Sequence, residues 1–440
     1  MKNIIDVDRD LNDHALDQEK LQFGMALRQL GALDFAQKIF SGIDSTNVPD
    51  VLLYKSISRF NQWDYEATLN DLIAYTESPK ITEQQKMIGL VNLAAALAHT
   101  EKYDQALDII QKAFRLAAKF NHQLIKANLM ELWAQILVSS NHFEEASSKL
   151  QEATLLINDN QSIYKLFVEK WRAILSLKQT NCSKESLQAL NAVRDKALQL
   201  KHWESIRDCD FYFATHKKDP YLFLRLFFGT PYSKYRHRLM VKMNQPTIVP
   251  KSFVWSGSFR FSPEDVDEKM QIDLTQNDIK IGSQEFDQFH LHILILKGLR
   301  CDFYAPVKPV SLYLRILKNE NLMPEEAIQR VFNAVSKLNT VLKKENIPLE
   351  VVSSDEGYRL TFKERYFLKI PIELQFQDRQ EFFQSHLKKP FSEQIFSSSD
   401  VCDVLQLSKR TTIRYLKDAV ESGTLASEGA GSKIRYRFAK

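Results

Sequence analysis

The stretch Glu101-Lys102-Tyr103-Asp104-Gln105-Ala106 decides the fold, because altered copies of it recur along the first half of the chain. The copies begin at Gly31, Asn61 and Asn141, and each places an aromatic residue near an acid and ends on a small residue. A tight turn of this kind joins two antiparallel helices, and the small residue lets the second helix approach the first closely. The pattern therefore predicts a series of helix pairs and a mainly α fold.

The small residues that close these turns are Ala36, Ala67, Ala106 and Ala146. They are spaced by 31, 39 and 40 residues, and Ser186 continues the series more weakly. In this the chain resembles tetratricopeptide (TPR) repeats over about residues 17–200, a family with a period of ~34 residues. The resemblance implies a TPR-like α-solenoid over residues 1–215, whose concave surface binds a protein or peptide and which Asn92 and Asn128 could line. A spacer or dimerisation scaffold without a ligand is the alternative.

Residues 216–265 form a basic, aromatic segment in which Asp219 is the single acid before residue 260. The interleaved residues include Lys217, Lys218, Arg225, Lys234, Arg236, Arg238 and Lys242 with Tyr221, Phe223, Phe228, Tyr232 and Tyr235. Such a mixture can track a phosphate backbone and stack on bases. It can equally form a packed connector with solvated charges, and we predict the connector.

Residues 266–375 change to a mixed pattern of short strands and helices. A hairpin is predicted around the turn 275–278, and three helices follow, over 285–296, around 311–317 and over 324–344. The longest helix is expected to bury one apolar face, which consists of Ile328, Val331, Val335, Leu338 and Leu342. A last hairpin contains Gly357-Tyr358-Arg359-Leu360.

This order resembles the winged-helix output domain of two-component response regulators, over about residues 268–362. The resemblance implies that residues 324–344 form a recognition helix. It gives four possible DNA-contacting residues: Arg330, Asn333, Lys337 and Arg359. The helix lacks the dense arginine run usual in that family, and no receiver domain with a phosphoacceptor precedes it. The alternative is a domain that kept the fold and exchanged DNA contacts for protein contacts.

Residues 376–440 carry a helix, a short turn and a second helix. Ser399 is a good N-cap for the first helix, Asp400 complements its dipole, and Ser408 is expected to cap the second. The expected inner residues are Val401, Val404 and Leu405 on the first helix and Ile413, Leu416 and Val420 on the second. This arrangement seats the second helix in the major groove of DNA, with its N-terminal residues foremost.

The segment after the turn at 429–432 alternates strictly, which predicts a β-hairpin wing with Tyr436 and its apolar neighbours inside and cations outside. The module resembles winged helix-turn-helix domains of bacterial repressors over about residues 380–438. The predicted contacts with double-stranded DNA are Lys409, Arg410, Thr411, Thr412 and Arg414 on the helix and Lys433, Arg435 and Arg437 on the wing. The helix is expected to read base edges, and the wing to neutralise phosphates.

The composition, with 44% apolar and 26% charged residues, is that of an ordinary soluble protein. The four cysteines show no paired spacing of a zinc site or disulfide framework, and no apolar run approaches the ~20 residues of a membrane helix. We therefore expect a cytoplasmic protein without membrane contact.

None of the motifs that mark nucleotide-binding loops, nucleophile elbows or zinc proteases is present. We therefore predict no catalytic residue, no metal site and no cofactor. The expected function is DNA-binding transcription regulation, with a protein or peptide partner on the repeats and a homodimer on two half-sites. The alternative is a scaffold subunit of a multi-protein assembly, in which winged helices dock proteins, as in assemblies with PCI domains.

Overall fold

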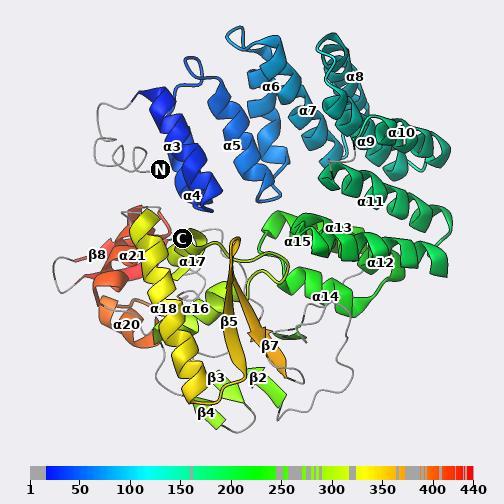
Figure 1. Cartoon of the computed structure of the whole chain (residues 1–440). Helices are drawn as coiled ribbons and strands as arrows, with labels where there is room; N and C mark the ends of the chain where they lie inside the picture. Colours follow the sequence, from blue (N-terminus) through cyan, green and yellow to red (C-terminus); the bar gives the residue numbers. More distant parts are fainter. Residues whose placement is uncertain are drawn as a thin grey trace. The chain divides into compact units, whose positions relative to one another are not determined.

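The computed structural model of this chain is mainly helical with small sheets, as the sequence predicts (Figure 1). It describes residues 16–158, 162–243, 250, 252–255, 270–273, 279–281, 284–286, 290–316, 324–362, 366–371, 387, 391, 394–405, 409–421, 423–429, 431 and 434–439. The chain forms two compact units, Met1–Ile372 and Glu373–Lys440. The predicted divisions at residues 215 and 265 therefore fall inside the first unit.

The N-terminal helices follow one another as pairs, coloured from blue to green in Figure 1. The pairs are α3 (Asp17–Gln29) with α4 (Leu33–Ser41), α5 (Asp50–Phe60) with α6 (Leu69–Glu77), α7 (Glu83–His99) with α8 (Tyr103–Lys119), α9 (Gln123–Ser139) with α10 (Phe143–Leu155), and α11 (Ser162–Gln179) with α12 (Lys184–Gln199), before α13 (Trp203–Lys217). Each helix packs against the next. Helix α9 also contacts α7 and α11, and α11 contacts α13. We call α7, α9, α11 and α13 the inner helices.

The turns between helices depend on single residues in the left-handed backbone region. The φ angle is +62° at Glu101, +50° at Asn121 and +63° at Asn141. Next to the first of these, the Lys102 amide donates a hydrogen bond of 2.9 Å to the Leu97 carbonyl, which satisfies a carbonyl at the end of α7. The recurring sequence pattern is thus a helix end followed at once by the start of the next helix.

The small residues that follow the turns are buried, with one exception. Ala36, Ala106 and Ala146 are fully buried, as their role in close helix packing predicts. Ala67 is exposed, and the buried position is taken by Thr68. The reason is a short 3₁₀ turn, η1 (Glu66–Thr68), which precedes α6 and shifts the inward position by one residue.

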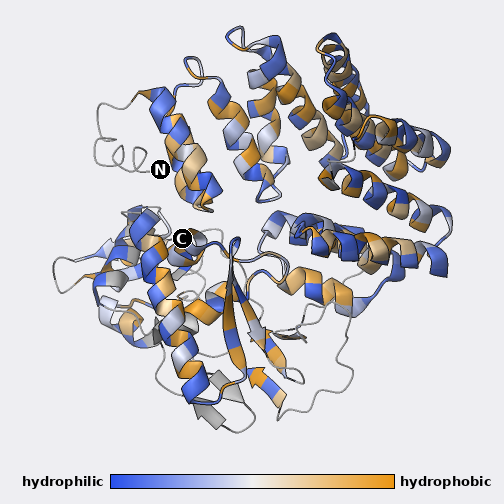
Figure 2. Cartoon of the chain, in the orientation of Figure 1, coloured by the Kyte–Doolittle hydropathy of each residue, from blue (hydrophilic) through white to orange (hydrophobic). Residues whose placement is uncertain are grey.

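The described part of the predicted connector contains the helices α14 (Pro220–Phe228) and α15 (Ser233–Met243) and the strand β1 (Ser252–Trp255). Asp219 caps α14, because its Oδ1 accepts hydrogen bonds from the amides of Tyr221 at 2.9 Å and Leu222 at 3.1 Å. Helix α14 is largely hydrophobic (Figure 2), and its Phe223 is fully buried. Helix α15 packs against α13 and α14. This segment is therefore part of the core of the first unit.

The remainder of the first unit combines helices with two sheets. Its helices are α16 (His290–Leu299), α17 (Pro309–Ile316) and α18 (Pro324–Lys344). Its strands are β1 (Ser252–Trp255), β2 (Gln271–Asp273), β3 (Ile279–Ile281), β4 (Gln284–Phe286), β5 (Leu349–Ser354), β6 (Gly357–Phe362) and β7 (Phe367–Pro371). One sheet has the order β1-β7-β2-β3-β4, with β7 parallel to β2 and antiparallel to β1, and β5 pairs with β6 alone.

The sequence placed both hairpins correctly but misplaced a helix start and one apolar residue. Strand β4 occupies the beginning of the helix predicted over 285–296, and α16 starts only at His290. On α18 the predicted inner residues Val331, Val335, Leu338 and Leu342 are buried. Ile328 is exposed, and Ala327 takes the inward position. The buried face of α18 is thus rotated by one residue in its first turn.

A buried ionic cluster joins the helical pairs to the segment after α16. The carboxylate of Asp210, in α13, is 1% exposed and accepts hydrogen bonds from Arg194 Nε at 2.7 Å and Arg225 Nη2 at 2.6 Å. The Tyr304 hydroxyl donates to the same carboxylate at 2.8 Å. We call these four residues the Asp210 cluster, which ties α12, α13 and α14 to Tyr304.

The first helix pair also contacts the segment that leads into α17. Ser311 Oγ donates a hydrogen bond of 2.9 Å to the Gly31 carbonyl, and Lys308 Nζ donates one of 2.5 Å to the Gln29 carbonyl. A β-carbon on Gly31 would lie only 2.3 Å from Ser311 Oγ, so this approach requires glycine. The first helix pair is therefore held by hydrogen bonds to residues that come 279 and 280 positions later in the sequence.

The second unit contains α20 (Ser398–Leu405), α21 (Lys409–Glu421), β8 (Leu425–Glu428) and β9 (Arg435–Phe438), and the two strands are antiparallel. The cap of α20 is Ser397 and not Ser399, because Ser397 Oγ accepts from the Asp400 amide and Asp400 Oδ2 accepts from the Ser397 amide. The buried core includes Phe396, Val401, Leu416, Ala419, Leu425 and Tyr436. Ile413, predicted inside, is 46% exposed.

Candidate functional site

A cationic face lies on α21 and β9 of the second unit. Lys409 and Arg410 are exposed in the first turn of α21, and Arg414 is half-buried one turn later. On β9, Arg435 and Arg437 are exposed while Tyr436 is buried, so the strand alternates as predicted. Lys433 and the side chain of Thr411 lie outside the described part of the chain. We call the four exposed residues Lys409, Arg410, Arg435 and Arg437 the cationic face.

Thr412 does not belong to this face, although we predicted it there. Its side chain is 0% exposed, and its hydroxyl accepts a hydrogen bond of 3.3 Å from Cys402 Sγ of α20. With Leu416 and Ala419 it forms the buried stripe of α21, at the spacing of four and three residues that one helix face requires. Thr412 therefore holds the two helices together.

The residues predicted for a second DNA contact divide into two groups. Arg330, Asn333 and Lys337 are exposed on α18, where Arg330 pairs with Glu326 at 3.2 Å. Arg359 is turned inward instead. Its Nη2 donates a hydrogen bond of 2.8 Å to the Tyr304 carbonyl, and its guanidinium lies 4.6 Å from the centre of the Trp203 ring. Burial lowers the pKa of Arg359, as expected for a guanidinium used in packing.

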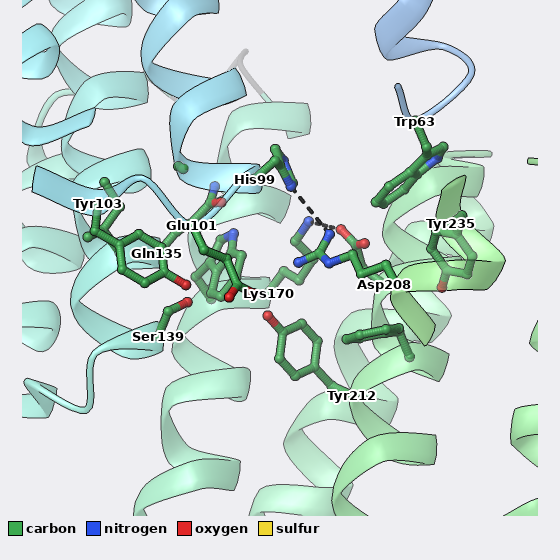
Figure 3. Close-up of a pocket in the computed structure, with 15 residues that line it drawn as sticks. Trp63, His99, Glu101, Tyr103, Gln135, Ser139, Lys170, Asp208, Tyr212 and Tyr235 are labelled. Carbon is green, nitrogen blue, oxygen red and sulfur yellow. Dashed lines mark hydrogen bonds and ion pairs between the residues drawn. The ribbon is translucent and has the colours of Figure 1, made fainter. Parts of the chain in front are cut away.

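A pocket of about 100 Å³ lies between the inner helices and α15. Its walls carry six aromatic side chains: Trp63, Tyr103, Trp171, Phe211, Tyr212 and Tyr235. Figure 3 shows Tyr103, Gln135 and Ser139 on one side of Lys170, with Trp63 and Tyr235 beyond Asp208 on the other. The walls come from segments more than a hundred residues apart in sequence.

An ion pair crosses the middle of this pocket. Lys170 Nζ lies 2.6 Å from Asp208 Oδ2, which joins α11 to α13. Burial lowers the pKa of Lys170, but the Asp208 carboxylate outweighs burial and the pKa lies above its ordinary value. Burial likewise raises the pKa of Asp208, and Lys170 reverses this so that the net pKa is lowered. Both groups therefore stay charged at neutral pH.

Arg238 enters the pocket from α15. Its Nη1 lies 3.4 Å from His99 Nδ1, and its guanidinium lies 5.5 Å from the centre of the Phe211 ring and 6.0 Å from that of Trp63. Burial and the neighbouring Arg238 lower the pKa of His99 to about 3, so the imidazole is neutral and can accept a hydrogen bond from the guanidinium. The basic segment thus supplies a cation to the inner helices.

Glu131, one helix turn before Gln135 on α9, is buried beside the pocket. Its Oε1 accepts a hydrogen bond of 2.6 Å from Gln135 Nε2. Burial raises the pKa of Glu131 to about 7, although Lys170 and the bond from Gln135 act in the opposite direction. This carboxyl group is therefore partly protonated near neutral pH.

Sequence reasoning missed this pocket. Asn92 and Asn128, which we expected on a binding surface, do not line it. In the sequence Arg238 is one cation among many in the basic segment, and nothing connects it with Lys170 or Asp208, because the three residues share no motif. The regular spacing of the helix pairs is the single signal that places residues of successive first helices close together.

Within the described residues, no cluster of three or more histidine, cysteine, aspartate or glutamate side chains is arranged to hold a metal ion. No helix in the described part of the chain is both long enough and apolar enough to cross a bilayer. No protein-family model matches the chain, and a search of curated proteins finds no significant relative.

Proposed function

We propose that the chain is a DNA-binding transcription regulator whose second unit contacts double-stranded DNA through the cationic face. The observation that carries this proposal is the exposure of Lys409 and Arg410 in the first turn of α21, a helix that starts four residues after α20 ends. Side chains in this place are the first to reach base edges when such a helix enters the major groove. Arginine there can bind guanine O6 and N7 in bidentate fashion.

The β8–β9 hairpin adds a second set of contacts. Arg435 and Arg437 stand on the outer side of β9, where long cationic side chains can reach phosphates and fix the position of the helix on the duplex. Such contacts add affinity that does not depend on sequence and that weakens as salt concentration rises. In this proposal Arg410 reads bases and the hairpin anchors the backbone.

We also propose the finer description of the fold. The helix pairs α3 to α12, with their buried small residues and left-handed turn residues, support a TPR-like solenoid that receives a protein or peptide partner or forms a homodimer. The order of α16, α17, α18 and the β5–β6 hairpin supports a winged helix in the first unit, and α20, α21 and β8–β9 support another in the second. A cytoplasmic location goes with this proposal.

A protein-docking role for α18 is the second candidate, and one observation favours it. Phe332 is 57% exposed and Ile328, one turn earlier, is 39% exposed, so the outer face of α18 carries apolar area. Exposed apolar patches are typical of protein contacts, and the nearby Arg330 is engaged by Glu326. For Arg330, Asn333 and Lys337 we therefore favour a protein contact over a DNA contact. A scaffold subunit of a multi-protein assembly would use them in this way.

DNA titration of the full chain tests the proposal. We expect fluorescently labelled genomic fragments to bind with a salt slope of about −0.9 for each phosphate contacted, and the triple variant Lys409→Ala, Arg410→Ala, Arg414→Ala to bind at least about tenfold more weakly. A matched variant that removes three exposed lysines elsewhere, Lys86→Ala, Lys184→Ala and Lys343→Ala, should bind like the wild type. Binding that ignores salt, or equal loss in both variants, would refute the assignment.

A further inference from the structure

We propose that the pocket between the inner helices and α15 binds a small organic monoanion, a carboxylate on a flat apolar body, with Arg238 as its charge partner. The cavity measures about 100 Å³. Sites for drug-sized ligands enclose ~300–1,000 Å³, so the ligand here is smaller than these.

One cation of the pocket, Arg238, has no carboxylate partner among the described residues. Lys170 is neutralised by Asp208 at 2.6 Å, and Glu101 by Lys242 at 2.5 Å. His99 is neutral, since burial holds its pKa at about 3. Among the described residues, no carboxylate pairs with Arg238. Arg238 is therefore the charged side chain of the pocket walls that has no ion-pair partner among the described residues, and one negative charge on a ligand would pair with it.

A carboxylate fits this cation better than other small anions do. Arg238 is partly exposed, and a carboxylate can accept two parallel hydrogen bonds from its guanidinium. A phosphate dianion would bring a second negative charge into a site with one unpaired cation. The charge count thus selects a monoanion.

The walls indicate an apolar body on this carboxylate. The Arg238 guanidinium lies near the rings of Phe211 and Trp63, so a group bound to it lies close to aromatic surface. Trp171 and Tyr212 add further aromatic surface to these walls. A planar ring with one carboxylate satisfies the charge and the walls together.

Calorimetric titration of the full chain with benzoate tests this proposal, with benzamide as the uncharged isostere and inorganic phosphate as the compact anion. We expect benzoate to bind with a Kd of about 1 mM or lower and at least about tenfold more tightly than benzamide. Arg238→Gln should weaken benzoate binding at least about tenfold. Lys234→Gln, an exposed position on the same helix that does not line the pocket, should leave it unchanged.

A second pair of variants separates binding from folding. Ser139 is exposed at the pocket wall and Ser140 is exposed beside it without lining the pocket. Ser139→Trp is expected to block benzoate while keeping the thermal midpoint of the wild type, and Ser140→Trp to bind benzoate normally. No saturable benzoate heat up to about 10 mM in the wild type would overturn the proposal. Equal affinity for benzamide, or displacement of benzoate by an equal concentration of phosphate, would also overturn it.

Discussion

Replacing Asp210 by asparagine tests whether the buried cluster around it holds the first unit together. The substitution keeps the size of the side chain but removes the charge that faces Arg194 and Arg225, whose contacts with it measure 2.7 and 2.6 Å. All three residues are at least 95% buried, so solvent does not screen the loss. Removing one partner of such a group typically costs about 3–5 kcal/mol, out of the 5–15 kcal/mol that stabilises a typical domain.

The assay is urea unfolding of the full chain, followed by far-ultraviolet circular dichroism and tryptophan fluorescence. Asp210→Asn should lower the unfolding free energy of the first unit by about 3–5 kcal/mol, whereas Tyr304→Phe, which removes one neutral donor to the same carboxylate, should cost only about 1 kcal/mol. Glu77→Gln, at an exposed carboxylate, serves as the control and should stay within about 0.5 kcal/mol of the wild type. An Asp210→Asn loss no larger than that of Tyr304→Phe would refute the claim that charge is what holds the cluster.

Two further outcomes follow from single buried groups. Burial raises the pKa of Glu131 from 4.5 to about 7, so the folded state keeps a proton that the unfolded chain releases, and stability falls as pH rises through this range. Glu131→Gln should therefore raise the unfolding free energy by about 3 kcal/mol at pH 8 and by much less at pH 5, and equal gains at both pH values would contradict this. Arg359→Gln should cost about 1–2 kcal/mol of stability through its contacts with Tyr304 and Trp203, and leave DNA affinity unchanged. If Arg359→Gln weakened DNA binding as much as the triple alanine variant of α21 does, Arg359 would have to be counted among the residues that contact DNA.

Local chemistry explains which parts of the fold the sequence predicted. A helix end that turns on Glu101 or Asn141 is encoded within a few residues, so both the turn and the buried alanine after it could be predicted. The alternation of β9 is equally local. The errors concern the exact face of a helix: Ile328 and Ile413 sit at the edge of an apolar stripe, where packing by other elements decides which residue points inward.

The pocket could not be predicted for a different reason. Trp63 and Arg238 both line it, yet they are 175 residues apart and are brought together by the stacking of several helix pairs. The number of residues in each turn and the packing between pairs together fix where side chains of successive helices meet. No pattern within one helix specifies that meeting, so the partners of Arg238 follow only from the assembled unit.

The contact between the first helix pair and the segment before α17 has a consequence for synthesis. Gln29 and Lys308 are separated by 279 residues, which makes this one of the longest-range contacts described in the chain. A ribosome adding about 5–20 residues per second would release the first pair many seconds before its partner emerges. During that interval the early helices can assemble among themselves only as an open-ended stack, whose terminal pair exposes the carbonyls of Gln29 and Gly31. Once Lys308 and Ser311 have left the ribosome, they can form hydrogen bonds with these carbonyls. Nascent chains arrested after this point should therefore resist protease near residue 30 more strongly than chains arrested before it.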